Sequence, residues 1–365
     1  MKIVHICNNY VGTKVHANQI ENISIDKSVY QNVIVPVYDK NHIGINEIEK
    51  DNIEINYIYV NVKFLKFFPL IKLLYITYII FANFKEIIKS ADVIYSHTLW
   101  TNGLPCYLAS IIYRKKFFIT IRSTDVGSFI KFLPHYRPLM KLIIRKASNV
   151  IFLTPIYKKR VVNSYPWLFK GISSIYIPNG IDEYWFTKVN NKSKQNQFIF
   201  VGRFTKNKNF KTVYKSFMKF YDLNRSYKLL VIGGSESELK HILKVDKLPG
   251  CIVVKGKITN IEELSDLYLT SRALVLPSIN ETFGLVYLEA LSRKCPVILS
   301  KGEAIDGLFP PCESISTVDS YNVEHIYDAL LKYGNDDFEF DFDDDELVSK
   351  YSWSSISDKI FNTIK

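Results

Sequence analysis

The sequence predicts an α/β protein of two domains, each built on a parallel sheet with helices on its faces. The chain has 365 residues, more than a single core of typical size needs. Short apolar runs alternate with longer helical patterns from one end to the other, which is typical of parallel sheets. This alternation stops at a polar stretch, residues 190–196, and then begins again. The restart indicates two domains rather than one.

In the first half, five short apolar runs predict strands, and the longer patterns between them predict helices. Two of these helices have a proline at a plausible first position, which the fixed φ of proline suits. The strands are expected at Lys2–Cys7, Gln31–Pro36, Val93–Ser96, Phe117–Ile121 and Val150–Leu153, and the helices at Pro69–Lys89 and Pro138–Ser148.

The second half repeats the alternation at the scale of a whole domain. Turn-forming residues at 177–182 indicate where the two halves join. Strands are expected at Gln197–Val201, Lys228–Ile232, Cys251–Lys255, Ala273–Leu276 and Pro296–Ser300, and helices at Asn209–Leu223, Glu236–Leu243 and Leu285–Arg293.

The cysteines and the apolar runs indicate a cytoplasmic protein. The five cysteines are scattered without paired or metal-ligand spacing, which argues for a reducing compartment. The start of the chain does not resemble an export signal. The longest charge-free apolar run, Leu73 to Phe84, is shorter than the ~20 residues of a membrane-spanning helix, so no such helix is expected.

Positive charge is concentrated in the first half. The formal net charge is +13 for residues 1–180 and −2 for residues 181–365, and residues 56–180 hold 18 basic side chains against Glu86, Asp92 and Asp125. This asymmetry favours a polyanionic partner for one half. Because the sequence contains no recognised nucleic-acid module, we expect the partner to be an anionic membrane surface rather than a nucleic acid. The protein is therefore expected to associate peripherally with the inner face of the cell membrane.

The basic and apolar residues that would meet the membrane lie in two segments. Arg137, Lys141 and Arg145 repeat at four-residue spacing along a helix, with Lys146 beside them. Apolar residues fill the rest of that helix, and an aromatic and basic mixture suited to headgroup depth precedes the first long helix. The apolar residues are Leu139, Met140, Leu142, Ile143 and Ile144, and the second segment comprises Lys63, Phe64, Leu65, Lys66, Phe67 and Phe68.

The acidic segment Asp336–Glu346 is predicted to be a solvated loop rather than a metal site. It has eight carboxylates in eleven residues, and Asp341-Phe342-Asp343 matches an Asp-x-Asp metal motif by chance in such a run. It also fails the calcium-loop pattern, because Glu346 stands where the glycine is required. No metal site is expected.

A candidate anion site follows the first strand of the second half. Gly202 at the carboxyl end of that strand allows a ligand to approach the backbone, at the edge where open α/β sheets bind ligands. Arg203 supplies a planar guanidinium suited to phosphate, and Lys208 supplies a second positive charge. An ordinary strand end followed by a basic helix start would look the same, so this segment alone does not identify a site.

A second constellation supports the site. Leu276-Pro277-Ser278 ends a strand, and a turn containing Glu281 leads through Gly284 into a helix that carries Glu289. The amides of Phe283, Gly284 and Leu285 at the helix start would attract an anion. Glu281 could accept hydrogen bonds from sugar hydroxyls, and Glu289 could bind the paired hydroxyls of a ribose.

Together these residues resemble the donor site of glycosyltransferase family 4, the retaining glycosyl transferases group 1. The matching residues are Val201-Gly202-Arg203 with Lys208, then Leu276-Pro277-Ser278 with Glu281-x-Phe283-Gly284-x4-Glu289-Ala290. Residues 178–182 resemble the domain junction of that family, and Ser352-Trp353 resembles the start of its closing helix. The resemblance covers nearly the whole chain and is stronger after residue 176.

The resemblance implies a GT-B fold with two Rossmann-like domains that face each other across a cleft. Residues 1–178 and the C-terminal helix 350–365 would form the acceptor-binding domain, and residues 179–349 the nucleotide-sugar-binding domain. Arg203 and Lys208 would neutralise the diphosphate leaving group, while Glu281 and the amides of residues 283–285 hold the donor sugar and Glu289 the ribose. The donor would be a UDP- or GDP-linked sugar that serves as co-substrate, with no cofactor and no metal.

In the first half the resemblance points to the end of the third predicted strand. His97 follows Tyr95-Ser96 there and resembles the family's cleft histidine near the reacting carbon. Gly12 lies in a loop that resembles the acceptor-facing loop, with His16 at the next helix. The chain departs from the family at Arg122-Ser123, where a His-Gly pair is frequent, and this departure puts the acceptor contacts in doubt.

The function implied is hexosyl transfer to a saccharide acceptor, expected to be lipid-linked, in bacterial surface polysaccharide synthesis such as capsule or O-antigen. Sugar-nucleotide epimerases share the GT-B fold and are the alternative enzyme class. A non-catalytic, membrane-docked binding subunit is a third hypothesis, which the complete set Arg203, Lys208 and Glu281 argues against.

Overall fold

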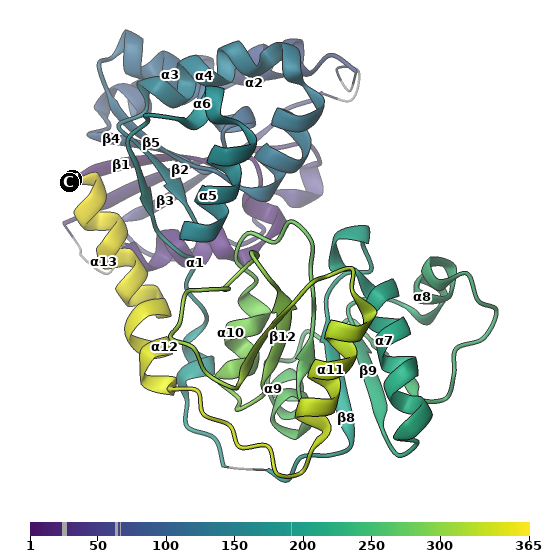
Figure 1. Ribbon diagram of the computed structural model, residues 1–365. Coiled ribbons are helices and arrows are strands. Elements are labelled where there is room, and N and C mark those ends of the chain that lie inside the picture. Colours follow the sequence, from purple (N-terminus) through teal and green to yellow (C-terminus); the bar gives the residue numbers. More distant parts are fainter. Residues whose placement is uncertain (24–27, 63–64, 66, 191) are drawn as a thin grey trace. The chain divides into compact units, whose positions relative to one another are not determined.

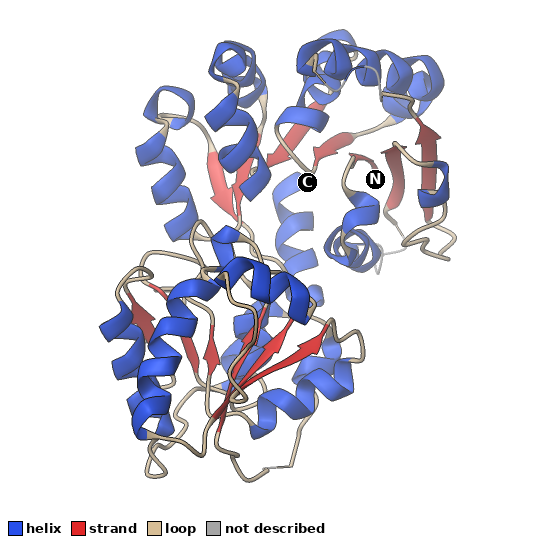
Figure 2. Cartoon of the chain, turned by 90° about the vertical axis from the view of Figure 1, so that its right-hand side faces the viewer, coloured by secondary structure: helices blue, strands red, loops and turns tan. Residues whose placement is uncertain are grey.

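The computed structural model describes residues 1–23, 28–62, 65, 67–190 and 192–365 (Figure 1). It divides into two compact units, Met1–Gly180 with Trp353–Lys365 as unit 1, and Ile181–Ser352 as unit 2. Each unit is an α/β domain whose described strands pair in parallel, and Figure 2 shows these strands gathered between helices. The predicted fold class of two Rossmann-like domains is confirmed. In the part of the chain that the structure describes, no helix combines the length and the apolar character needed to cross a membrane.

Unit 1 contains a seven-stranded sheet in the order β3-β2-β1-β4-β5-β6-β7, so the strand order reverses between β1 and β4. The five predicted strands are present within one residue at each end. The edge strands β3 and β7 were not predicted, because β3 is only partly buried and β7 has three residues. The strands are β1 Lys2–Ile6, β2 Tyr30–Val37, β3 Ile53–Tyr59, β4 Val93–Ser96, β5 Lys116–Thr120, β6 Asn149–Phe152 and β7 Ser174–Tyr176.

The two faces of this sheet bury separate cores, because successive strand residues point to opposite sides. In β4, Ile94 packs with α2, α3 and α4, whereas Val93 and Tyr95 pack with α13. The C-terminal helix therefore belongs to unit 1. The helices of unit 1 are α1 Lys14–Ile23, α2 Pro69–Ser90, α3 Trp100–Ile112, α4 Arg137–Lys146, α5 Pro155–Ser164, α6 Pro166–Phe169 and α13 Trp353–Ile364.

One close contact fixes where the two ends of unit 1 meet. A Cβ atom on Gly180 would lie 2.5 Å from Cδ2 of Trp353, so only glycine leaves room for the indole ring. Trp353 is the first residue of α13 and packs beside Ile177 in the core under that helix. The Pro178-Asn179-Gly180 and Ser352-Trp353 segments thus adjoin each other in space.

Unit 2 contains a six-stranded sheet in the order β10-β9-β8-β11-β12-β13, and its order reverses between β8 and β11. Strand β13 and helices α9 and α11 were not predicted. The strands are β8 Gln197–Val201, β9 Lys228–Ile232, β10 Ile252–Gly256, β11 Leu274–Val275, β12 Val297–Ser300 and β13 Ile315–Val318. The helices are α7 Phe210–Leu223, α8 Glu236–Leu243, α9 Ile261–Thr270, α10 Leu285–Leu291, α11 Val323–Gly334 and α12 Asp344–Tyr351.

Helix α10 ends two residues earlier than the sequence predicts. Lys294 adopts a left-handed backbone with φ of 49°, and the amide of Cys295 turns back to the carbonyl of Ala290. This geometry closes a helix C-terminus and usually uses glycine. The preceding residue, Arg293, is fully buried and donates hydrogen bonds to the carbonyls of Tyr184 (2.6 Å) and Trp185 (2.9 Å). A buried arginine therefore fixes the segment that leads into unit 2.

Candidate functional site

The predicted donor-site residues gather at one edge of the sheet of unit 2. Gly202 and Arg203 follow β8, and the turn at residues 280–284 follows β11. These two strands are neighbours, and the strand order reverses between them. Open α/β sheets bind their ligands at such points, because the loops leaving the two strands part there. The topology thus places the two motifs, far apart in the sequence, at one location.

Lys208 and Glu281 form an ion pair at this edge. Nζ of Lys208 lies 2.5 Å from Oε2 of Glu281, and both side chains are partly exposed. Two further contacts join the loops: the amide of Ile279 donates to the carbonyl of Asn207 (2.7 Å), and Asn209 Nδ2 donates to the carbonyl of Pro277 (3.3 Å). The two residues for which the sequence predicted separate roles, one at the diphosphate and one at the sugar, are therefore direct partners.

Gly202 and Gly233 keep the neighbouring strand ends close together. A Cβ atom on Gly233 would lie 2.3 Å from the carbonyl oxygen of Gly202, and the φ of Gly233 is +128°. Arg203 comes next and is exposed, and it lines a cavity of about 660 Å³ together with Gly233 and Glu238. The two glycines thus let the ends of β8 and β9 pack closely, and Arg203 supplies a positive charge to the cavity beside them.

Gly284 is required by the turn into α10. Its φ is +77°, and a Cβ atom there would lie 2.4 Å from Cε2 of Tyr287, whose hydroxyl donates to the carbonyl of Leu276 (2.6 Å). Phe283 is buried and packs on Tyr351, and Leu285 begins the helix. The helix that follows this turn, α10, has seven residues, and the positively charged side chains at this edge are Arg203 and Lys208.

Glu289 is a carboxyl group in an unfavourable electrostatic environment. Burial raises its pKa from 4.5 to about 7, and the negative charge of Asp182 adds to the effect. A carboxyl group held in this way is a candidate for function, because binding of a hydrogen-bond donor would stabilise its charged form.

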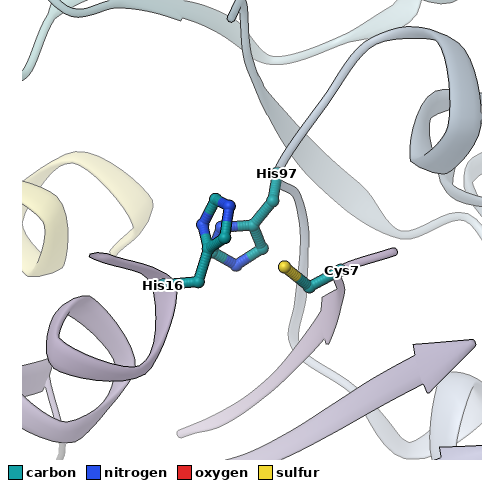
Figure 3. Close-up of side chains that lie close together, drawn as sticks. All are labelled: Cys7, His16 and His97. Carbon is teal, nitrogen blue, oxygen red and sulfur yellow. The ribbon is translucent and has the colours of Figure 1, made fainter. Parts of the chain in front are cut away.

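A second candidate site lies in unit 1, where the strand order reverses between β1 and β4. Cys7 follows β1, and His97 follows β4. Figure 3 shows Cys7, His16 and His97 with their side chains close together. The rings of His16 and His97 meet edge to face, with centroids 4.8 Å apart, and all three residues are buried. The structure therefore brings the predicted His97 and His16 together. Gly12 ends a short 3-10 helix, and a Cβ atom there would lie 2.5 Å from Oδ1 of Asn9.

In the described residues, Cys7, His16 and His97 are the group whose donor atoms best match a metal site, since these atoms lie within 4.8 Å of one another. One feature disfavours a cation there, because burial raises the pKa of Cys7 to about 12 and so favours the thiol over the metal-binding thiolate. Burial, together with the nearby positive charge of Arg122, holds the pKa of both histidines well below 6.5, so that both imidazoles are neutral. We therefore interpret the group as neutral and polar.

Sequence reasoning gave no role to Arg122 or Asp125, yet both residues shape this site. The buried carboxylate of Asp125 accepts hydrogen bonds from the amides of Leu99 (3.0 Å), Trp100 (3.2 Å) and Arg122 (2.9 Å). Burial raises its pKa to about 6 despite these bonds. Asp125 thereby fixes the start of α3 and the position of Arg122, whose Nη1 donates to Oδ1 of Asn179 (3.1 Å).

His5 and Gln31 were also missed, although the sequence carried a signal. Both are polar residues within otherwise apolar predicted strands, and both are buried. His5 Nδ1 lies 3.1 Å from His97 Nε2, and His5 Nε2 lies 2.9 Å from Gln31 Oε1. A buried polar side chain in a core strand needs a hydrogen-bond partner, so a polar residue in an apolar strand pattern indicates a candidate site.

The acidic segment is more structured than predicted. Asp341 accepts hydrogen bonds from the amides of Glu313 (2.8 Å) and Ser314 (2.9 Å), and Asp343 caps α12 through the amide of Asp345. Residues 336–343 form a loop, and Asp341 is exposed, as predicted, although backbone donors occupy its carboxylate; the prediction is wrong for residues 344–346, which begin α12.

Comparison with known proteins relates the second half of the chain to a family of known proteins. Residues 182–346 match the family model of the glycosyl transferases group 1. The chain is 26% identical over 222 residues to the O-antigen chain mannosyltransferase RfbU of Salmonella typhimurium, a match that covers 57% of this chain and 60% of that protein. The chain thus spans less than two thirds of the length of this relative.

Two solved structures share the fold over their whole lengths. Sucrose-phosphate synthase from Thermosynechococcus elongatus has a TM-score of 0.77 at 17% identity and covers 99% of this chain and 98% of its own. HepE from Anabaena, solved in complex with UDP and glucose, has a TM-score of 0.67 at 14% identity and covers 100% and 99%. At these identities the likeness shows the fold alone.

Proposed function

We propose that the chain is a glycosyltransferase of GT-B type and, within that class, a retaining hexosyltransferase. Residues 182–346 match the glycosyl transferases group 1, and the fold resembles that of sucrose-phosphate synthase. The donor is a sugar linked to UDP or GDP, and the acceptor is a saccharide carried on a lipid. The product belongs to a bacterial surface polysaccharide. The observation that carries this proposal is the ion pair of Lys208 with Glu281 at the edge of the sheet of unit 2 where Gly202 and Arg203 follow β8.

The charges at this edge suit a diphosphate leaving group. Negative charge grows on the diphosphate as the bond to the sugar breaks, and fixed positive charges stabilise it. Arg203 lines the open cavity, and the carboxylate of Glu281 holds the ammonium group of Lys208 in place. Glu281 in turn faces the donor sugar, and Glu289 accepts hydrogen bonds from the ribose. Arg203 and Lys208 supply the positive field, so the proposed transfer needs neither metal nor cofactor.

The acceptor class rests on the relative and on unit 1. RfbU acts as an O-antigen chain mannosyltransferase, and an O-antigen is a bacterial surface polysaccharide. In the proposed enzyme, His97 lies near the reacting carbon, and His97 and His16 contact the bound saccharide, with Gly12 in the adjoining acceptor-facing loop. Arg122, which stands where the family frequently has histidine, brings a positive charge to this cluster.

We also propose that unit 1 docks on the anionic inner face of the cell membrane. Figure 1 shows α2, α3, α4 and α6 side by side in one layer of unit 1. Large apolar side chains on these helices are exposed, where an ordinary surface would be polar. Arg145 and Lys146 at the end of α4 are exposed as well and would meet anionic headgroups. The exposed apolar residues are Ile71, Leu74 and Tyr78 on α2, Ile111 and Ile112 on α3, Leu142 on α4 and Trp167 on α6.

The structure corrects the residues expected at this surface. Met140, Ile143 and Ile144 pack in the core of unit 1, and Leu139 is partly buried against it, so Leu142 is the exposed member of the predicted apolar set. Lys141 lies over the ring of Trp167 at 4.0 Å, and Arg137 donates to the carbonyl of Ile130 (2.9 Å). Leu65 is buried, Phe67 and Phe68 are exposed, and Lys63, Phe64 and Lys66 lie outside the described residues.

The proposed function is tested by screening nucleotide sugars against lipid-linked saccharide acceptors with the purified full-length protein. Release of nucleoside diphosphate that depends on the acceptor, with the anomeric configuration of the donor kept in the product, supports it. Formation of an epimer of the donor without any acceptor would instead identify an epimerase.

A further inference from the structure

A chain of buried hydrogen bonds crosses unit 1 and ends at His97. The carbonyl oxygen of Ile20 in α1 lies 2.8 Å from Nε2 of Gln31, and Oε1 of Gln31 lies 2.9 Å from Nε2 of His5. Nδ1 of His5 lies 3.1 Å from Nε2 of His97. Gln31, His5 and His97 are almost completely buried. The side chains of this hydrogen-bond chain are therefore shielded from bulk water.

The direction of this chain follows from its first member. A backbone carbonyl can only accept a hydrogen bond, so the atom of Gln31 that faces Ile20 is the amide nitrogen. The other side-chain atom of Gln31 is then the oxygen, and it accepts from Nε2–H of His5. The neutral ring of His5 has its lone pair on Nδ1, which accepts from Nε2–H of His97. One fixed acceptor thus determines the proton positions of both rings.

The last atom of this hydrogen-bond chain, Nδ1 of His97, is left without a partner. Nδ1 of His97 is buried and has no hydrogen-bond partner, and the same holds for Nδ1 of His16 beside it. An unsatisfied buried acceptor costs stability, and in native proteins it calls for an explanation such as a bound ligand. In this tautomer, Nδ1 of His97 carries a lone pair, so the missing group must donate a hydrogen bond.

We propose that Gln31 and His5 are positioning residues that hold His97 in its neutral Nε2–H tautomer, so that Nδ1 accepts a hydrogen bond from a hydroxyl of the bound saccharide. The role in binding rests on the proposed function. A hydroxyl fits better than a phosphate or carboxylate, whose oxygens would repel the lone pair. It also fits better than a metal ion, because Arg122 already places a positive charge near Cys7, His16 and His97. Since His97 is buried, side chains around it must give way when the hydroxyl binds.

The charged and titratable groups around these hydrogen bonds favour donation from His97 to His5 and from His5 to Gln31. Protonation of His5 would add a proton to Nδ1 and reverse the hydrogen bond to His97. Burial opposes it by lowering the pKa of His5 to about 4, against a smaller opposite effect of Gln31. The neighbours are the neutral groups His16, Tyr95 and Cys7 and the cation Arg122, whose field further disfavours charged imidazoles.

The proposal is tested by nitrogen NMR of the full-length protein with ¹⁵N-labelled histidine. At neutral pH we expect His97 to be protonated at Nε2 and bare at Nδ1. Gln31→Met removes the acceptor for His5 and should give a mixture of His97 tautomers. Gln19→Met is the matched control, because Gln19 is an equally buried glutamine that bonds to Tyr95 outside the chain (3.2 Å). His5→Asn keeps an acceptor oxygen near His97 and should preserve its tautomer.

The kinetic readout follows the tautomer. In a transfer assay, kcat should fall in Gln31→Met in proportion to the lost Nε2–H tautomer of His97, about twofold for an even mixture, and stay near wild type in His5→Asn and Gln19→Met. A wild-type His97 that carries its proton on Nδ1, or a tautomer unchanged in Gln31→Met, overturns the proposal. So does a changed tautomer with unchanged kcat. Zn²⁺ that shifts the signals of His16 and His97 in the wild type, but not in Cys7→Ser, would show a metal site instead. If no donor is transferred at all, the proposed function fails, while the spectra still decide the tautomer.

Discussion

Lys208 Nζ lies 2.5 Å from a carboxylate oxygen of Glu281, although 73 residues separate the two in sequence. The pair joins the loop after β8 to the turn after β11, across the point where the strand order of unit 2 reverses. A free lysine side chain is flexible and would have to be ordered when a ligand binds. The ion pair fixes its ammonium group beforehand, which is the condition for strong electrostatic stabilisation of a leaving group.

Removal of either positive charge at this edge should slow transfer. We expect Arg203→Ala and Lys208→Ala each to lower turnover on the order of 10²–10³-fold, as removal of one fixed electrostatic donor does. Glu281→Gln should also impair transfer, because Lys208 loses its partner. Lys206→Ala is the control, since Lys206 is exposed on the same short 3-10 helix. Rates of nucleoside diphosphate release measure the effect, and near-wild-type rates in Arg203→Ala and Lys208→Ala would refute the assignment.

Glu289 should make stability depend on pH. Its pKa in the folded protein is raised from 4.5 to about 7. The contribution of protonated Glu289 to the free energy of unfolding is therefore fully present below pH 4.5 and is lost as the pH rises through about 7. At about pH 8, Glu289→Gln should therefore be more stable than the wild type, by on the order of 2 kcal/mol after allowance for partial exposure. The two proteins should converge towards acid pH.

Thermal unfolding at several pH values measures this difference, with Glu339→Gln, an exposed glutamate, as the control. Titration with UDP and GDP should show weaker nucleotide binding in Glu289→Gln, because the ribose loses a charged acceptor. A stability difference that does not change with pH would contradict the raised pKa.

Gly180→Ala should destabilise unit 1. The added methyl group would lie 2.5 Å from the Trp353 ring, which core side chains hold in place. Overpacking of this kind costs about 1–3 kcal/mol. Gly127→Ala is the control, because no atom lies within 4 Å of the new methyl group. If the contact is the cause, Trp353→Leu should recover part of the loss in the Gly180→Ala background, as measured by urea unfolding; equal effects of the two alanine variants would argue against it.

Membrane docking should depend on anionic lipid and on the end of α4. Binding to liposomes should rise with anionic lipid content and fall with salt, since each basic residue near the surface contributes about 1 kcal/mol. Arg145→Glu with Lys146→Glu should weaken binding, whereas Lys211→Glu with Lys215→Glu, the same charge change on α7, should not. Co-sedimentation is the measurement. Equal binding to neutral and anionic vesicles would refute docking and leave the transferase proposal intact.

Transfer should survive exhaustive chelation. Arg203 and Lys208 supply positive charge at the edge proposed to bind the diphosphate, and the carboxylate of Asp341 is already occupied by the amides of Glu313 and Ser314. Activity measured after EDTA treatment should match the untreated enzyme. A loss of activity that magnesium or manganese restores would overturn this prediction and return attention to Asp341-Phe342-Asp343.

Much of the fold was predictable because it depends on local patterns. The central strands are nearly continuous apolar runs, since helices cover both faces of a parallel sheet, and a sequence shows such runs directly. β8 and β9 match the predicted ranges Gln197–Val201 and Lys228–Ile232. β3 was not predicted because its half-buried side chains mix polar and apolar types. β7 was not predicted because a strand of three residues shows no pattern.

The sequence by itself determined the two-domain α/β architecture and the candidate residues of unit 2, whose glycines, cations and carboxylates stand at strand ends in recognisable order. Only the tertiary structure decided their partners. It pairs Lys208 with Glu281, encloses Cys7, His16 and His97 in one cluster, and extends that cluster through His5 to Gln31. The physical reason is that strand composition records which residues are buried, whereas contacts between residues of distant segments depend on the order in which the strands join the sheet.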